Sequence, residues 1–220
     1  MNLLKMSSLE IPFYKNWGYR CAQATMKSAL ASIHPEKNFS YLLLDKVTNR
    51  KKKEWTLFPQ IAMGFLRLNI PFKYYTERIR LETYLQNDPI KQFERLCGYH
   101  SKEVLEHINF PSLEKAIRLI LDTNSYTEGK PTLELLEKEL ETNPIICAID
   151  FMIASGASEK EFREHVIVLT YIGSHNVYYH NNGPKNAIPN KKLSKEQFLK
   201  AWENPSLFDY GTIIPICSQK

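Results

Sequence analysis

Three residues of this 220-residue chain could together perform nucleophilic chemistry: a cysteine, a histidine and an asparagine. Cys21 follows a glycine-containing loop at 15–20 and lies where a helix is expected to begin. A helix N-terminus presents free N–H groups and a partial positive charge, which favour the thiolate and can stabilise an oxyanion. A free cysteine is also commonly just a small, packed side chain. Cys21 alone therefore leaves both interpretations open.

The histidine and the asparagine are expected to meet on neighbouring strands. His165 precedes the apolar run 166–171, so it stands at the start of a largely buried strand, a fixed position that suits a general base. A hydrogen-bonded histidine at a strand end is an equally good interpretation. Because a turn at Gly173 makes the next strand antiparallel, Asn181 is expected beside His165, where its amide oxygen could fix the imidazole tautomer. The segment 181–184 is also a good turn former.

The elements that would position these residues are helices first and strands afterwards. Apolar residues recur at helical spacing from Cys21 until Pro35 stops the pattern. This order predicts an α+β fold in which N-terminal helices pack on a C-terminal antiparallel sheet. Further helices are predicted at 40–47, 59–68, from Thr132 onward and at 194–202, with Ser40, Thr132 and Ser194 as N-caps, and strands at 70–75, 144–151, 165–171, 176–179 and 211–216.

Residues 77–130 are charged and mostly helical in pattern. They lack the apolar content of an independent core. We therefore expect one domain over residues 1–220, with 77–130 as a helical insertion or lid. The clearest apolar stripe of this segment is formed by Ala116, Ile117, Ile120 and Leu121.

Composition and charge exclude several classes of protein. Hydrophobic residues make up 43% and charged residues 24%, which is typical of globular proteins and not of disordered or fibrous ones. The net charge of +5 lacks the concentrated basic face of a nucleic-acid binder, so no nucleic-acid partner is expected, and a binder that uses 50–53 is the least favoured interpretation. No run approaches the length of a membrane span, and the start lacks the apolar stretch of a signal peptide. We expect a cytoplasmic protein, with signal-independent secretion left open.

The remaining cysteines and histidines predict no cofactor and no metal. Cys21, Cys97, Cys147 and Cys217 form neither a CxxC motif nor a disulfide scaffold, and Cys147 lies in an apolar run typical of a buried core. His175 and His180 have no cysteine or carboxylate at ligand spacing nearby. No glycine-rich phosphate loop and no GxSxG motif occurs.

The order of these segments resembles the C39-like peptidases of the papain-like cysteine peptidase superfamily. The resemblance rests on Cys21 at a helix start, on His-Val-Ile-Val-Leu-Thr-Tyr-Ile-Gly at 165–173 and on Asn-Val-Tyr-Tyr-His-Asn-Asn-Gly-Pro at 176–184. In the family the corresponding stretches read approximately Cys-Gly-Pro/Ala-Ala, then His before a Val-rich strand ending in Gly-Tyr, then a tyrosine-bearing strand ending in Asp-Pro. It covers most of the chain outside 77–130. It implies a papain-like fold and thiol-dependent attack on an amide or related acyl carbon.

The chain departs from the family pattern at three places. Ala22 follows the cysteine where the family usually has glycine, and Asn181 stands where the family usually has aspartate, as in papain-type Cys-His-Asn sites. The oxyanion glutamine of the family lies some six residues before the cysteine, where this chain has Lys15 and then Asn16. Asn16, Lys15 and Gln23 are the oxyanion candidates. Loss of one such donor typically costs about 10²–10³ in rate, which does not abolish activity.

The sequence therefore predicts a cysteine-dependent hydrolase, first of all a peptidase, that acts through Cys21, His165, Asn181 and a thioester intermediate. Its partners are expected to be peptide or protein substrates, with acidic sequences favoured by the basic excess. Two alternatives stay open: a thiol acyltransferase on the same fold, and a non-catalytic papain-like module that binds a peptide or partner protein. The occupant of the oxyanion position distinguishes the catalytic from the non-catalytic interpretation.

Overall fold

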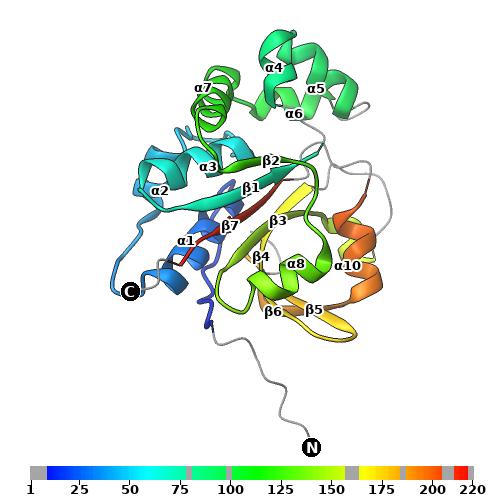
Figure 1. Cartoon of the computed structure of the whole chain (residues 1–220). Coiled ribbons are helices and arrows are strands. Elements are labelled where there is room, and N and C mark those ends of the chain that lie inside the picture. The colour runs from blue at the N-terminus through cyan, green and yellow to red at the C-terminus, as the bar shows by residue number, and fades with distance from the viewer. Residues whose placement is uncertain are drawn as a thin grey trace, which may run out of the picture.

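A seven-stranded sheet runs through the protein in the order β2-β1-β7-β3-β4-β5-β6 (Figure 1). The structure, a computed structural model, describes residues 9–77, 81–97, 101–156, 164–183, 187–204 and 211–217. All neighbouring strands pair antiparallel except β1 and β2, which are parallel. The strands are β1 (Phe72–Thr76), β2 (Tyr126–Glu128), β3 (Ile145–Asp150), β4 (Glu164–Ile172), β5 (Asn176–Asn181), β6 (Ile188–Ser194) and β7 (Thr212–Pro215).

Helices cover the sheet, and several begin where the sequence predicts. The predicted N-caps are confirmed: the hydroxyls of Ser40, Thr132 and Ser194 each accept a hydrogen bond from a backbone N–H of the following turn. The helices in the described parts of the chain are α1 (Cys21–Ile33), α2 (Tyr41–Val47), α3 (Phe58–Arg67), α4 (Leu81–Gln86), α5 (Pro89–Cys97), α6 (Ser101–His107), α7 (Phe110–Leu121), α8 (Leu133–Glu139), α9 (Phe151–Ser155) and α10 (Lys195–Trp202).

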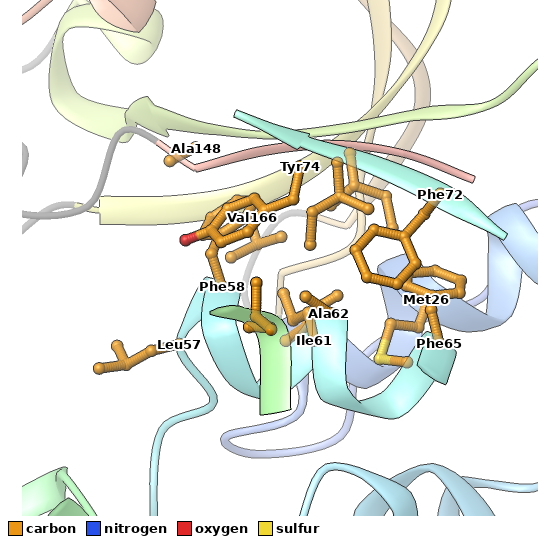
Figure 2. Close-up of a cluster of buried hydrophobic side chains, with 14 of the residues drawn as sticks. Met26, Leu57, Phe58, Ile61, Ala62, Phe65, Phe72, Tyr74, Ala148 and Val166 are labelled. Atoms are coloured by element: carbon orange, nitrogen blue, oxygen red, sulfur yellow. The ribbon is translucent and has the colours of Figure 1, made fainter. Parts of the chain in front are cut away.

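Two apolar cores form because side chains of a strand alternate between the faces of the sheet. From β3, Ile146 and Ala148 join the core that contains α1 and α3, which Figure 2 shows in close-up. Ile145 and Cys147 join the opposite core, with Trp202 of α10. Cys147 is fully buried, as its apolar run predicts.

The sheet is wider than the sequence predicts. Helices do precede most strands, and the fold is mixed α/β, but β1 and β2 come from the N-terminal and middle parts of the chain and extend the C-terminal sheet. The segment 77–130 contributes β2 as well as α4 to α7. Side chains of these helices join the same core as α1 and α3: Leu81, Tyr84, Phe93, Val104, Leu113, Ile117 and Ile120.

Figure 1 shows α4, α5 and α6 grouped at one end of the molecule, at the top of the view. The function of the segment 77–130 as an insertion or lid stays a prediction.

Among the helices of the described residues, none combines the length and apolar character needed to cross a membrane.

Candidate active site

The loop before α1 holds Cys21 at the first position of that helix. The amide oxygen of Asn16 accepts a hydrogen bond from the Arg20 N–H at 2.9 Å, and its amide nitrogen donates to the Gly18 carbonyl at 2.9 Å. Gly18 has φ +72°, a left-handed conformation that glycine adopts without strain. Asn16 is buried, and the helix has no side-chain N-cap. Backbone N–H groups of the first turn are therefore left for another acceptor.

A buried threonine ties the first turn of α1 to the strand that carries the histidine. The Thr25 hydroxyl lies 2.9 Å from the Cys21 carbonyl and 3.2 Å from the Val166 carbonyl. Val166 directly follows His165 in β4. The N–H of Val166 is also among the backbone groups that act on the Cys21 sulfur. The fold thus brings Cys21 and the start of β4 together.

His165 and Asn181 form the pair that the turn at Gly173 predicts. The Nε2 atom of His165 lies 3.0 Å from Oδ1 of Asn181. The same oxygen accepts the N–H of Gly183 at 3.2 Å, and the side chain is 1% exposed. Since Oδ1 is an acceptor in both contacts, Nε2 carries the hydrogen of the neutral ring, and Nδ1 is left as the proton acceptor.

The N-terminal segment straps the end of β5 to the loop before the cysteine. The N–H of Asn16 donates to the Asn182 carbonyl at 2.8 Å, and the Asn182 amide donates to the Tyr14 carbonyl at 2.6 Å. Two residues before Asn182, Nε2 of His180 donates to the Ile11 carbonyl at 2.7 Å. The loop before Cys21 and the Asn181 end of the sheet are thus fixed to each other by hydrogen bonds to the backbone. The sequence predicts a turn at 181–184 and gives no sign of these bridging contacts.

Two further side chains belong to the site and were not identified from the sequence. The Phe151 ring meets the His165 ring edge-on, with centroids 5.5 Å apart. The ammonium of Lys191 lies 5.3 Å from the centroid of the Phe151 ring. Phe151 opens α9, which Asp150 caps by accepting two backbone N–H groups. An aromatic ring and a cation therefore shield one side of the imidazole.

Burial controls the protonation of both reactive groups. Burial raises the pKa of Cys21, although the N–H groups of Ala22, Val166 and Cys21 itself and the charge of Arg50 lower it. Burial lowers the pKa of His165 to about 4; the hydrogen bond that its Nε2–H donates to Asn181 raises this pKa, and the charge of Lys191 lowers it. The first turn of α1 acts in the expected direction, but desolvation outweighs it. Both pKa shifts favour the neutral forms, a thiol at Cys21 and a neutral imidazole at His165.

Gln23, one of the three oxyanion candidates, has its amide committed elsewhere. Its side chain is fully buried, and Nε2 donates to Thr48 Oγ1 at 3.1 Å and to Thr56 Oγ1 at 2.8 Å. Both amide hydrogens are used in these contacts, which fasten α1 to the end of α2 and to the loop before α3. Gln23 therefore supports the position of the helix and does not donate to a bound substrate.

The other two candidates lie in the loop itself. Asn16 uses its amide to close the loop, as described above. Lys15 is exposed, and its ammonium lies 5.2 Å from the centroid of the Trp17 ring. This leaves the backbone N–H groups at the start of α1 as the most fixed donors near Cys21.

Among the described residues, no group of three or more His, Cys, Asp and Glu side chains is arranged to hold a metal ion. Both ring nitrogens of His180 have protein partners, since Nδ1 accepts the Asn190 N–H at 3.1 Å and Nε2 donates to Ile11.

Comparison with known proteins gives a likeness of fold. No family model matches the sequence, and none of the curated proteins does. Among solved structures, the chain is similar to the crystal structure of a putative C39-like peptidase from Bacillus anthracis. The TM-score is 0.54 with 11% sequence identity, and the match covers 98% of each chain. At this identity the likeness shows a shared fold, and it agrees at that level with the resemblance seen in the sequence.

Proposed function

We propose that the chain is a cysteine-dependent peptidase with a papain-like arrangement, in which Cys21 is the nucleophile, His165 the base and Asn181 the group that orients the base. The observation that carries this proposal is the 3.0 Å contact between His165 Nε2 and Asn181 Oδ1, which leaves Nδ1 as a proton acceptor at the end of the strand against which α1 packs. The whole-chain likeness to a putative C39-like peptidase supports it.

The reaction follows from the neutral resting pair. Nδ1 of His165 takes the thiol proton of Cys21 while the sulfur attacks the carbonyl carbon of a peptide bond. The tetrahedral intermediate collapses as its C–N bond breaks, and the imidazolium gives its proton to the leaving amine. Water then attacks the thioester: His165 takes one proton from it, the C–S bond breaks, and the proton returns to the sulfur. A carboxylic acid and an amine are the products.

The negative charge on the oxygen of the tetrahedral intermediate must be stabilised by hydrogen-bond donors near Cys21. The first-turn N–H groups of α1 supply them, since no side chain caps that helix and the N–H groups of Cys21 and Ala22 already act on the Cys21 sulfur. In this scheme Asn181 stays neutral. Its carbonyl oxygen holds the Nε2–H in place and stabilises the imidazolium that forms during attack.

The second candidate function is a non-catalytic module that binds a peptide in the same place. It is favoured by two observations: Gln23 and Asn16 both have their amides committed to structural contacts, and burial raises the pKa of the Cys21 thiol. In this case the arrangement of Cys21, His165 and Asn181 would remain while the chemistry is absent.

The deciding experiment measures cleavage of a mixed peptide library by mass spectrometry. The parent protein, Cys21→Ser, His165→Ala and the control Cys217→Ser are compared, since Cys217 lies two residues beyond β7 and its N–H donates to Asn143. Cleavage that is lost in the first two variants and kept in the control supports the peptidase. Cleavage that persists in Cys21→Ser refutes it, and no cleavage at all favours the binding module. Products joined to an added amine would identify an acyltransferase.

A further inference from the structure

Two large aromatic side chains stand exposed directly before the nucleophile. Trp17 is 66% exposed and Tyr19 is 47% exposed, on the loop 15–20 that leads into Cys21. Isolated exposed apolar residues need no explanation, but two on one short loop beside a reactive group form a surface. We call these two side chains, with Lys15 and Lys27, the aromatic surface.

Polar contacts, and not the two aromatic rings, hold this loop in place. Asn16 closes the loop with its buried amide and bonds through its N–H to Asn182. The Tyr41 hydroxyl donates to the Lys15 carbonyl at 2.7 Å. Since the loop is already fixed by these contacts, Trp17 is not required as an anchor, and its ring faces solvent without a conformational role in the loop.

The Tyr19 ring packs against other side chains of the protein. Its ring lies 5.4 Å from the His107 ring, which in turn stacks on Trp55 at 4.9 Å. His107 is held by its Nδ1 atom, 2.9 Å from the Lys53 carbonyl. A supported ring loses little freedom on binding, so it offers contact area at low entropic cost.

One positive charge lies beside Trp17, and a second lies over Tyr14 and Tyr41, of which Tyr41 contacts the same loop at Lys15. The Lys15 ammonium lies 5.2 Å from the Trp17 ring, and that of Lys27 lies 4.5 Å from the Tyr14 ring. Within the described residues, neither ammonium forms a salt bridge with a carboxylate, whereas the neighbouring Arg20 is paired with Asp45 at 2.8 Å. The surface therefore combines uncovered aromatic area with cations that lack an anionic partner there.

We propose that this aromatic surface binds the substrate, and that it selects a peptide segment in which an aromatic or large apolar side chain stands next to an acidic one. The apolar side chain packs on Trp17 and Tyr19, and the carboxylate pairs with Lys15 or Lys27. The assignment of this peptide as a substrate rests on the proposed function. Its binding does not, because Cys21 takes no part in the recognition.

Binding is tested on Cys21→Ala, which cannot turn over, by fluorescence anisotropy with labelled peptides that carry Phe-Glu, Ala-Glu, Phe-Gln or Phe-Lys in a glycine and serine background. We expect Phe-Glu to bind about 10-fold tighter than Ala-Glu or Phe-Lys, the scale of one good stacking or charged contact. Adding Trp17→Ala should bring Phe-Glu to the affinity of Ala-Glu. Adding Lys15→Gln and Lys27→Gln should bring it to that of Phe-Gln.

The matched control is Ile90→Ala, which removes an exposed apolar side chain (46%) on α5. Equal affinity for the four peptides, or a Trp17→Ala effect no larger than that of Ile90→Ala, overturns the proposal. The proposal is also overturned if sedimentation shows self-association that depends on Trp17. It is overturned likewise if Trp17 mediates binding to phosphatidylcholine and phosphatidylglycerol vesicles and not to the peptides.

The same peptides given to the parent protein separate the two proposals. Selective binding by Cys21→Ala without cleavage by the parent keeps the aromatic surface as a peptide site and refutes the peptidase. Cleavage by the parent that ignores Phe and Glu keeps the peptidase and refutes the aromatic surface.

Discussion

Replacing Lys191 with methionine should make His165 easier to protonate. The Lys191 ammonium lies 5.3 Å from the centroid of the Phe151 ring, and that ring lies 5.5 Å from the imidazole, so the charge is within about 11 Å of the ring it acts on. This charge is one of the causes that lower the pKa of His165 to about 4, after burial. Methionine is unbranched and nearly as long as lysine, so the substitution removes the charge and keeps most of the side chain's volume.

The expected magnitude follows from Coulomb's law. At about 10 Å and an effective dielectric constant of about 20 to 40, the repulsion between the ammonium and an imidazolium is about 0.8 to 1.7 kcal/mol. Since about 1.4 kcal/mol corresponds to one pH unit, removing the charge should move the titration midpoint by about 0.6 to 1.2 pH units. Lys191 is half-buried, and solvent screening favours the lower part of this range.

The direction of the pKa shift follows from the positive charge of Lys191. A positive neighbour disfavours the imidazolium, so its loss raises the pKa of His165, and the midpoint moves to higher pH. The midpoint is read from the histidine ring signals in NMR, with His165 assigned by substitution. If the peptidase proposal holds, the acid limb of kcat/KM moves by the same amount, because only the neutral imidazole can accept the thiol proton.

Lys192 provides the matched control, since it is the exposed neighbour on β6 and alternation turns it to the other face. Lys192→Met removes the same charge and should leave the midpoint in place. A midpoint that does not move in Lys191→Met, or that moves equally in both variants, refutes the argument that Lys191 acts locally through its position over Phe151.

Three other predictions concern the support of the site. Asn181→Ala should lower kcat/KM by about 10²–10⁴, with KM little changed, and Asn181→Asp should retain most activity because an acceptor stays beside His165; equal losses in both variants would contradict this. Gln23→Leu should cost about 1–3 kcal/mol in urea unfolding, since two threonine hydroxyls lose their buried donor; a rate loss with unchanged stability would instead make Gln23 an oxyanion donor. Gly211→Ala should destabilise by about 1–3 kcal/mol or more, because a Cβ there would lie 1.9 Å from the Phe58 ring; an unchanged unfolding midpoint would refute it.

The pairing of His165 with Asn181 was predictable because its causes are local in sequence. The run 166–171 is β-branched and apolar, the turn at Gly173 is short, and the distance along each strand sets which residues face each other. Helix starts were predictable for a similar reason, since a serine or threonine cap bonds to the next turn of its own helix.

Lys191 and Phe151 were not predictable in the same way. Residues 188–194 read Ile-Pro-Asn-Lys-Lys-Leu-Ser, which lacks the alternation of a strand and contains a proline. This is the composition of an edge strand, whose lysines and proline oppose pairing with other chains, and β6 is indeed at the edge of the sheet. Without that strand, no argument from the sequence brings Lys191 close to His165.

The hydrogen bonds of the Gln23 amide likewise depend on residues that are distant in the sequence. A glutamine two positions after Cys21 looks available from its position in the helix. Its amide is nevertheless bonded to Thr48 and Thr56, 25 and 33 residues away, and no local pattern reveals these contacts. Burial in a core that many segments build together decides what such a polar side chain can do.

Desolvation also changes how the reactivity of Cys21 should be interpreted. From the helix N-terminus alone, a thiolate at mildly acidic pH would be expected, and slow alkylation there would count against catalysis. Because burial raises the pKa of Cys21 and lowers that of His165, the structure favours a neutral pair in which the proton moves only during attack. Slow alkylation is therefore compatible with a working peptidase. The dependence of turnover on His165, and not the resting reactivity of the thiol, is the property that separates an enzyme from a binding module.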